Sequence, residues 1–301
     1  MVKPTMLTAR ALASDISLPS IHPFSEEPET NTIPMLEHIC GLHHIAVPSN
    51  TLPPAVTTNS LLIGDEDAFK VLTDPSPASK AVLQNLINTL ENNQPDAVLL
   101  THHHPDHHER APELARHLNI PILCTAITES HILANWGDDY FAGIEIRHIS
   151  QDEVITQWLG HDVICHELPG HDDGMVGLAP ENMAWFYVAD LVEAGTTVVI
   201  PEDVGDMAAY FGTLERAIAM NPRVTIPSHG LPSGGTHLLE KTLKHRQKRE
   251  QQVEAAYANG CRGSELTAAL YPDLNPGLIP YAEQNIRQHL RKLGHLPPFA
   301  S

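Results

Sequence analysis

Thr101-His102-His103-His104-Pro105-Asp106-His107-His108 places five histidines and one aspartate within eight residues, directly after the apolar run Ala97-Val98-Leu99-Leu100. The apolar run predicts a short buried strand, and Pro105 prevents that strand from continuing regularly. The histidine cluster is therefore expected on a loop at the carboxyl end of a strand, which is where α/β sheets place their chemistry.

The spacing within the cluster predicts a metal site. Alternate side chains of an extended segment point the same way, so we expect His102 and His104 to share one side, with Asp106 close behind. Neutral imidazole nitrogens and a carboxylate suit zinc and similar divalent ions. A solvated histidine tract with incidental metal affinity is the alternative. We favour the metal site because the pattern His-x-His-x-Asp-His follows a buried strand.

The composition is that of an ordinary globular protein. Of the 301 residues, 42% are hydrophobic and 18% are charged, and no apolar run is long enough to predict a membrane-spanning helix. The four cysteines are widely spaced and form no Cys-x-x-Cys pair, and three lie in apolar or strand-like surroundings, so we expect these three to be small buried residues rather than disulfides or ligands. This cysteine usage predicts a reducing, cytoplasmic compartment.

The charge is strongly negative and unevenly distributed. The net charge is −19, yet nine Lys/Arg and six Asp/Glu lie from His237 onward, so this last part carries +3 and the preceding part −22. An acidic body repels polyanions, which counts against non-specific nucleic-acid binding by the main domain. A net +3 over 65 residues is also a weak footprint for a nucleic-acid partner.

Periodicity divides the chain into three parts: an irregular, proline-rich extension at 1–36, a catalytic domain at 37–235 and a helical region at 236–301. In the first half of the domain, strands are predicted at 41–49, 59–64, 69–74, 96–100 and 120–124, with helices at 79–92, 109–118 and 127–136. In the second half, strands are predicted at 144–149, 162–168, 175–178, 183–188 and 223–227, with a helix at 205–220. Helices at 237–258, 264–271 and 280–293 follow. Two β-rich halves, each with helices, predict a β-sandwich flanked by helices in the α/β class.

Four further side chains stand at predicted strand ends or in glycine-bounded turns, namely Asp74, His171, Asp190 and His229. Each alone is a weak signal, because Asp and His at such positions are usually turn formers or solvated groups. Their combination with the cluster at 101–108 is much stronger, since carboxylates and imidazoles from several strand ends would meet at one sheet edge.

In this order, the residues resemble the five-motif signature of the metallo-β-lactamase superfamily, over about 41–235. The resemblance implies an αβ/βα four-layer sandwich with a two-metal site along one edge. It assigns His102, His104 and His171 to one metal, and Asp106, His107 and His229 to the other. Asp190 would bridge both metals, and Asp74 would orient a ligand without binding metal.

The implied chemistry is hydrolysis. Two divalent ions about 3.5–4 Å apart share a water and lower its pKa, which leaves a bridging hydroxide positioned for attack, while Asp106 transfers a proton to the leaving group. Two Zn²⁺ per chain are expected, and iron or manganese is compatible with the same ligands. The pairing of Asp106 with Asp190 resembles the glyoxalase II-like hydrolases more than the true β-lactamases.

Three residues depart from the family pattern or lie outside it. Asp172 stands where the family usually has threonine, and we expect it to add negative charge near the metals and to disfavour anionic substrates slightly. His103 and His108 have no ligand role in the family. We expect them to be solvated or to face the substrate.

The region from 236 resembles the winged-helix-like tail of the β-lactamase-like-protein-2 group, which includes a mitochondrial endoribonuclease and fungal polyketide thioesterases. We therefore expect a binuclear zinc hydrolase of a small-molecule thioester, ester or lactone. The alternative is a single-strand-specific endoribonuclease in which the basic helix delivers RNA to the metals. A non-catalytic metal-binding protein is a third reading, which leaves the convergence of ligands from several strands unexplained. A glutathione-thioester hydrolase is disfavoured, because no basic cluster follows Asp190.

Overall fold

The computed structural model describes residues 31–195 and 197–297. Most of the predicted N-terminal extension, residues 1–30, lies outside the described residues. The end of that extension is not irregular, because strand β1 (Met35–Ile39) pairs with β2 (Leu42–Pro48) in antiparallel register. Ile39 and Leu42 pair on either side of the turn, and the intervening Gly41, at φ 72°, suits a tight turn between two strands.

The first sheet has seven strands in the sequential order β1 to β7. Strands β1 to β4 pair antiparallel, and β4 to β7 pair parallel. Parallel neighbours require crossover connections, and two of them are the helices α2 (Lys80–Leu90) and α4 (Ala111–Leu118). The third is α5 (Ala126–Trp136). The remaining strands are β3 (Thr57–Ile63), β4 (Val71–Thr73), β5 (Ala97–Leu99), β6 (Ile122–Cys124) and β7 (Ile146–His148).

The second sheet has six strands in the order β13-β12-β11-β10-β9-β8. All neighbours are antiparallel except β11 and β12, which pair parallel around helix α6 (Met207–Ala219). The strands are β8 (Val154–Trp158), β9 (His161–Glu167), β10 (Val176–Pro180), β11 (Phe186–Tyr187), β12 (Val224–Ile226) and β13 (Ser233–Gly234).

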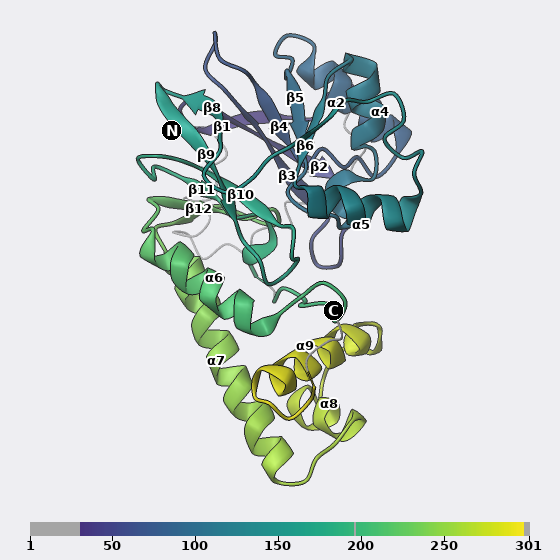
Figure 1. Cartoon of the computed structure of the whole chain (residues 1–301), viewed down its shortest axis with the longest axis vertical. Coiled ribbons are helices and arrows are strands. Elements are labelled where there is room, and N and C mark those ends of the chain that lie inside the picture. Colours follow the sequence, from purple (N-terminus) through teal and green to yellow (C-terminus); the bar gives the residue numbers. More distant parts are fainter. Residues whose placement is uncertain (1–30, 196, 298–301) are drawn as a thin grey trace, which may run out of the picture.

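Three apolar layers hold the domain together. Between the two sheets, buried residues of both meet, such as Leu61 and Leu99 from the first and Val163 and Trp185 from the second. A second cluster joins the first sheet to α2, α4 and α5, and a third joins the second sheet to α6 and the start of α7. The result is helices, sheet, sheet, helices (Figure 1). This confirms the predicted four-layer α/β sandwich.

The helical region extends away from the sandwich. Helix α7 (His237–Ala258) starts against α6 and runs to the far end of the molecule, where α8 (Ser264–Leu270) and α9 (Ile279–Lys292) pack beside it (Figure 1). A small cluster of Val253, Leu266, Ile286 and Leu290 joins the three helices. Among the described residues no strand follows β13, so this region is the predicted helical appendage.

Two differences from the predicted elements concern the second sheet. Strand β8 was not predicted, because it begins with the half-exposed Val154 and its alternation over five residues is too short to stand out. The strand predicted at 183–188 shrinks to β11, because the chain turns at Met183 and begins a 3-10 helix at Ala189.

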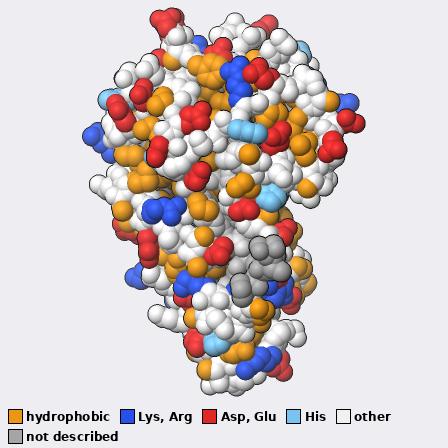
Figure 2. Space-filling view, viewed as in Figure 1, with side chains coloured by type: hydrophobic (Ala, Val, Ile, Leu, Met, Phe, Trp, Pro, Cys, Tyr) orange, Lys and Arg blue, Asp and Glu red, His pale blue; other side chains and the backbone are white. Residues whose placement is uncertain are grey.

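The surface and the helices agree with a charged, globular exterior. On the face shown in Figure 2, Asp and Glu side chains are spread over the sandwich, and Lys and Arg stand among them singly rather than as one basic patch. None of the helices in the described part of the chain combines the length and apolar character that a membrane span needs.

Candidate metal centre

The eight predicted site residues meet at one edge of the sandwich, where strands of both sheets end. His102 and His104 follow β5 and precede the short helix α3 (Pro105–His108), which carries Asp106 and His107. The other residues come from the turn after β9, the 3-10 helix η1 (Ala189–Leu191), the segment after β12 and the residue after β4. The turn at His171 depends on Gly170, because at φ 136° a Cβ would collide with the backbone of Tyr210.

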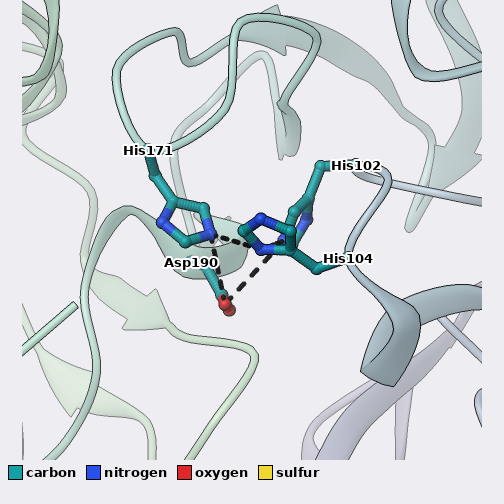
Figure 3. A group of neighbouring side chains, drawn as sticks. All are labelled: His102, His104, His171 and Asp190. Carbon is teal, nitrogen blue, oxygen red and sulfur yellow. Dashed lines mark hydrogen bonds and ion pairs between the residues drawn. The ribbon is translucent and has the colours of Figure 1, made fainter. Parts of the chain in front are cut away.

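Three imidazoles form the first group (Figure 3). His104 Nδ1 lies 3.2 Å from His102 Nε2 and 2.9 Å from His171 Nε2. As the alternation predicted, His102 and His104 converge while the ring of His103 turns to Asp172.

For His102 and His171, a hydrogen bond at the outer ring nitrogen fixes which nitrogen faces the centre. The Thr101 hydroxyl donates to Asp74 Oδ2, so His102 Nδ1–H must donate to Thr101 Oγ1, at 2.9 Å. His171 Nδ1–H donates to the carbonyl of Val199 at 2.7 Å. The Nε2 atoms of His102 and His171 are therefore bare lone pairs aimed at one point, the arrangement that a cation stabilises.

Asp106, His107 and His229 form the second group in the same way. His229 Nε2 lies 3.3 Å from Asp106 Oδ2, and His107 Nε2 lies 3.8 Å from Asp106 Oδ1. His107 Nδ1–H donates to Asp74 at 3.1 Å and His229 Nδ1–H to the Thr57 carbonyl at 2.9 Å, so both Nε2 atoms face inward.

Asp190 lies between the two groups. Its Oδ2 is 3.8, 3.7 and 3.5 Å from Nε2 of His102, His171 and His107, and its Oδ1 is 3.6 Å from Nε2 of His229. Asp190 Oδ1 and His107 Nε2 are buried without a hydrogen-bond partner among the described residues. Buried polar atoms are rarely left unpaired, so these orphaned acceptors fit divalent cations shared through Asp190.

Asp74 orients the centre from beneath. Its carboxylate accepts the Thr101 N–H at 2.8 Å and the Thr101 hydroxyl at 2.7 Å, and the Tyr187 hydroxyl lies 2.9 Å from Oδ2. The Thr101 hydroxyl connects Asp74 to the ring of His102, and Asp74 hydrogen-bonds the ring of His107 directly. Asp74 is fully buried and has φ 43°, a conformation that Asp tolerates better than most residues.

We expect Asp74→Asn to reduce metal affinity or hydrolysis about 10- to 100-fold, the usual cost of losing a group that orients a ligand. The amide replaces an acceptor with a donor facing Thr101 and His107. Competition with a chromophoric zinc chelator measures the affinity. Asp96→Asn is the matched control, since Asp96 is an exposed aspartate that bonds only to the Lys70 N–H away from the centre. Unchanged zinc affinity in Asp74→Asn would contradict this role.

Burial and neighbouring charges set the protonation of the ligand groups. Burial and the imidazole of His171 lower the pKa of His104 to about 3, and burial with His107 lowers the pKa of His102. Burial raises the pKa of Asp190, but His107 and His229 outweigh it and hold that pKa below its usual value. Neutral imidazoles and ionised carboxylates are the forms that bind metal.

His107 and His229 differ, and this predicts a pH dependence of metal binding. Burial lowers both pKa values, but Asp190 and Asp106 outweigh burial, so the pKa of His107 lies well above its usual value and that of His229 is raised to about 9. A metal in the second group must therefore displace protons from these imidazoles, so the apparent affinity should fall by about tenfold or more per pH unit below the pKa of His229. Calorimetric titration in buffers of different ionisation enthalpy counts the released protons. Affinity that is constant between about pH 7 and about pH 9 would contradict the assignment.

His103 and His108 are not solvated, which corrects one expectation. His108 is fully buried, with Nδ1 at 2.8 Å from the Tyr140 hydroxyl and Nε2 at 2.9 Å from the His103 carbonyl. His103 is 8% exposed and hydrogen-bonds Asp172. It also lines the cavity described below, as the substrate-facing alternative predicts. The ring of His108 packs against Tyr140, and that of His103 lies between Asp172 and His131, contacts that no local pattern encodes.

The negative charge of Asp172 is paired with neighbouring groups. Burial raises its pKa, but the hydrogen bond with His103 outweighs burial and lowers the pKa to about 2. Its other oxygen accepts the Gly174 N–H at 2.6 Å. The expected negative charge is thus present but paired with His103 rather than facing the substrate.

Sequence reasoning missed Glu193, which lies close enough to Asp190 and His229 to share a cation with them. Burial and the charge of Asp190 raise its pKa to about 7. Its position three residues after Asp190 was the available signal, but a carboxylate there belongs to no motif.

The C-terminal helices hold the segment that orients His171. The Val198 carbonyl accepts from Arg246 on α7 and from Asn285 on α9, and the Ile200 N–H donates to Asn285 at 2.9 Å. Val199, whose carbonyl accepts from His171, lies between these two anchored residues. Further along the segment, Gln288 donates to Gly205 at 2.8 Å.

A cavity of about 700 Å³ opens over the centre. Its walls include the candidate ligands, the loop at 50–53, the segment after Asp190 and residues of α7 and α9. The helical region therefore closes the space in which a substrate would meet the metals.

The family comparison agrees with this geometry. Residues 53–229 match the model of the metallo-beta-lactamase superfamily, and residues 264–295 match that of the beta-lactamase associated winged helix domain. The chain belongs to the metallo-beta-lactamase superfamily and is a metal-dependent hydrolase.

Three known proteins illustrate the relationship. The beta-lactamase-like protein 2 homolog of Drosophila melanogaster is 23% identical, over 80% of this chain and 84% of that protein. A hydroxyacylglutathione hydrolase of Hamiltonella defensa is 34% identical over 36% of this chain and 43% of its own length. A beta-lactamase domain protein from Burkholderia ambifaria has the same fold, with a TM-score of 0.73 and 20% identity over 91% of both chains.

Proposed function

We propose that the protein is a binuclear zinc hydrolase that cleaves a small-molecule thioester, ester or lactone. The observation that carries the proposal is the convergence of five inward-facing imidazole nitrogens and the carboxylates of Asp106 and Asp190 on one centre. His102, His104 and His171 would hold one ion, Asp106, His107 and His229 the other, and Asp190 both. This nitrogen-rich donor set favours zinc over magnesium or calcium. Residues 37–235 would carry the chemistry, and 236–301 would close the cavity.

The bound ions would supply Lewis acidity and a nucleophile available at neutral pH. The chain's own residues supply orientation and proton transfer. Asp74 and the Val199 carbonyl keep the imidazole rings in one orientation and one tautomer. Asp106 is a less buried ligand than Asp190, with 16% of its side chain exposed against 8%, and it lines the cavity. It is therefore placed to take a proton from the attacking water and deliver it to the leaving group.

Among thioesters, esters and lactones, we favour a thioester as the substrate. The hydroxyacylglutathione hydrolase that this chain resembles over part of its length is named for cleaving a thioester. A cavity of about 700 Å³ also suits a small molecule.

Endoribonuclease activity is the weaker alternative. Five basic residues of α7 suggested it: Lys241, Lys244, Arg246, Lys248 and Arg249. Arg246 is 1% exposed and donates to the Val198 carbonyl, and Arg249 donates to the Leu270 carbonyl and lines the cavity instead of the outer face of the helix. Of these five, Lys241, Lys244 and Lys248 are exposed, which is a small basic surface for a nucleic-acid strand beside a strongly acidic body.

The test is a panel assay of zinc-loaded protein against thioesters, lactones, a cephalosporin and single-stranded RNA. We expect turnover of a thioester or ester that is abolished by chelation and restored by zinc. Cleavage of RNA alone, lost on neutralising Lys241, Lys244 and Lys248, would establish the alternative instead. Protein that takes up zinc yet hydrolyses nothing in the panel would count against the proposal.

A further inference from the structure

The cavity over the metal centre has a second end. From the candidate ligands it extends between the sandwich and the helical region, where Arg249 on α7 and Tyr271, Leu274 and Leu278 after α8 form its wall. Leu52 lines it from the opposite loop. Most of this far end is therefore apolar or aromatic, and Arg249 is the only Lys or Arg among the lining residues that the structure describes.

Arg249 is fixed without an acidic partner. Its Nη1–H donates to the Leu270 carbonyl at 2.9 Å, and its guanidinium stacks 4.1 Å over the centre of the Tyr271 ring. Its Nε is buried and has no hydrogen-bond acceptor within the described part of the chain. By contrast, Arg287 and Arg291 on α9 both pair with Glu202.

The charge at this end of the cavity is therefore uncompensated. Two further carboxylates line the cavity, Asp203 and the Glu193 already placed beside Asp190 and His229, and neither pairs with Arg249 in the described structure. His245, one turn before Arg249, adds little charge at neutral pH because burial and Arg246 lower its pKa. A guanidinium already held by a stack and one carbonyl loses little freedom when it binds a planar anion.

We propose that Arg249 binds an anionic oxygen group, a carboxylate or a phosphate, at the end of the substrate remote from the scissile bond. The substrate would then be an amphipathic acyl compound: its reactive carbonyl lies at the metals, its chain crosses the apolar wall and its anion meets Arg249 and Tyr271. This inference rests on the proposed hydrolysis for the position of the carbonyl. It also predicts that an anionic compound binds at Arg249 even when it is not hydrolysed.

The experiment uses the zinc-loaded full chain and two matched series. Kinetics compare 4-nitrophenyl alkanoate esters of increasing chain length that end in a carboxylate, a phosphonate or a neutral carboxamide. Calorimetry compares the binding of adipate with that of hexanoate, which lacks the second carboxylate. We expect an anionic ester to exceed its carboxamide twin in kcat/KM by about tenfold or more, the usual value of a charged hydrogen bond. Whether the carboxylate or the phosphonate gains more identifies the anion.

Arg249→Gln should abolish this preference, and it should also remove the advantage of adipate over hexanoate. Arg249→Lys should restore part of both, because it keeps the charge but not the planar fork. Lys248→Gln is the matched control, an exposed neighbour on the same helix that does not line the cavity. A preference unchanged in Arg249→Gln, or no adipate advantage in the native protein, would overturn the inference. If no compound of the panel and no ester of this series is hydrolysed, the proposed function fails, and the calorimetry still decides the role of Arg249.

Discussion

Asp190→Ala is expected to bind one zinc per chain instead of two and to lose hydrolysis by more than the ~100-fold that an orienting residue costs. The reason is its position: its two oxygens lie 3.5–3.8 Å from the inward nitrogens of four histidines. Alanine removes the anion that offsets two dications and links their positions. Elemental analysis gives the zinc content, and turnover of the substrate found by the panel gives the activity.

A suitable control is Asp173→Ala, close to the centre in sequence. Asp173 pairs with His131 at 2.8 Å and half of its side chain is exposed, so it contributes no ligand atom to the two groups. Both zinc ions and most of the activity should remain in this variant. Two tightly bound zinc ions in Asp190→Ala would show that the groups hold their metals independently.

The second large effect separates neighbours within the histidine cluster. His104→Ala should be inactive and deficient in zinc, because His104 Nδ1 lies about 3 Å from the nitrogens of His102 and His171. His103→Ala should retain its zinc, because the ring of His103 points to Asp172 instead. The measurement is zinc content and hydrolysis for both variants, purified in the same way.

The burial of His103 changes what its removal does. Asp172 would be left buried without its imidazole, and breaking a buried pair in this way costs on the order of 3 kcal/mol. We therefore expect a lower melting temperature for His103→Ala with its zinc content intact, and partial recovery in the double variant His103→Ala, Asp172→Ala. Zinc loss in His103→Ala as severe as that in His104→Ala would contradict the orientation of the loop.

The sandwich was predictable because its signals are local. Apolar runs such as the one at 97–100 define buried strands, and a histidine or aspartate at the end of each run indicates where the sheet edge lies. The convergence of His102 with His104 followed from the alternation of extended backbone alone. Strand β8 escaped prediction because its five residues are too few for a clear alternation and its first residue, Val154, is exposed.

Features that depend on distant partners could not be predicted. The hydrogen bonds from Asp74 to Thr101 and His107 connect separate strands, and the burial of His108 depends on Tyr140, 32 residues away. The basic residues of α7 formed one charged stretch in the sequence. In the structure Arg246 donates to the Val198 carbonyl and Arg249 lines the cavity, and both positions depend on partners that the sequence of the helix does not show.

The anchoring of Val198 and Ile200 by α7 and α9 has a consequence for how this protein can evolve. The carbonyl that fixes the ring of His171 sits between those two anchors, so the appendage and a candidate metal ligand share one short piece of backbone. A recombination event that exchanged the tail for another, to acquire a new substrate, would also disturb the ring that we propose as a metal ligand. Tail and ligand should therefore be inherited together, and new specificities should arise by point substitutions along the cavity wall.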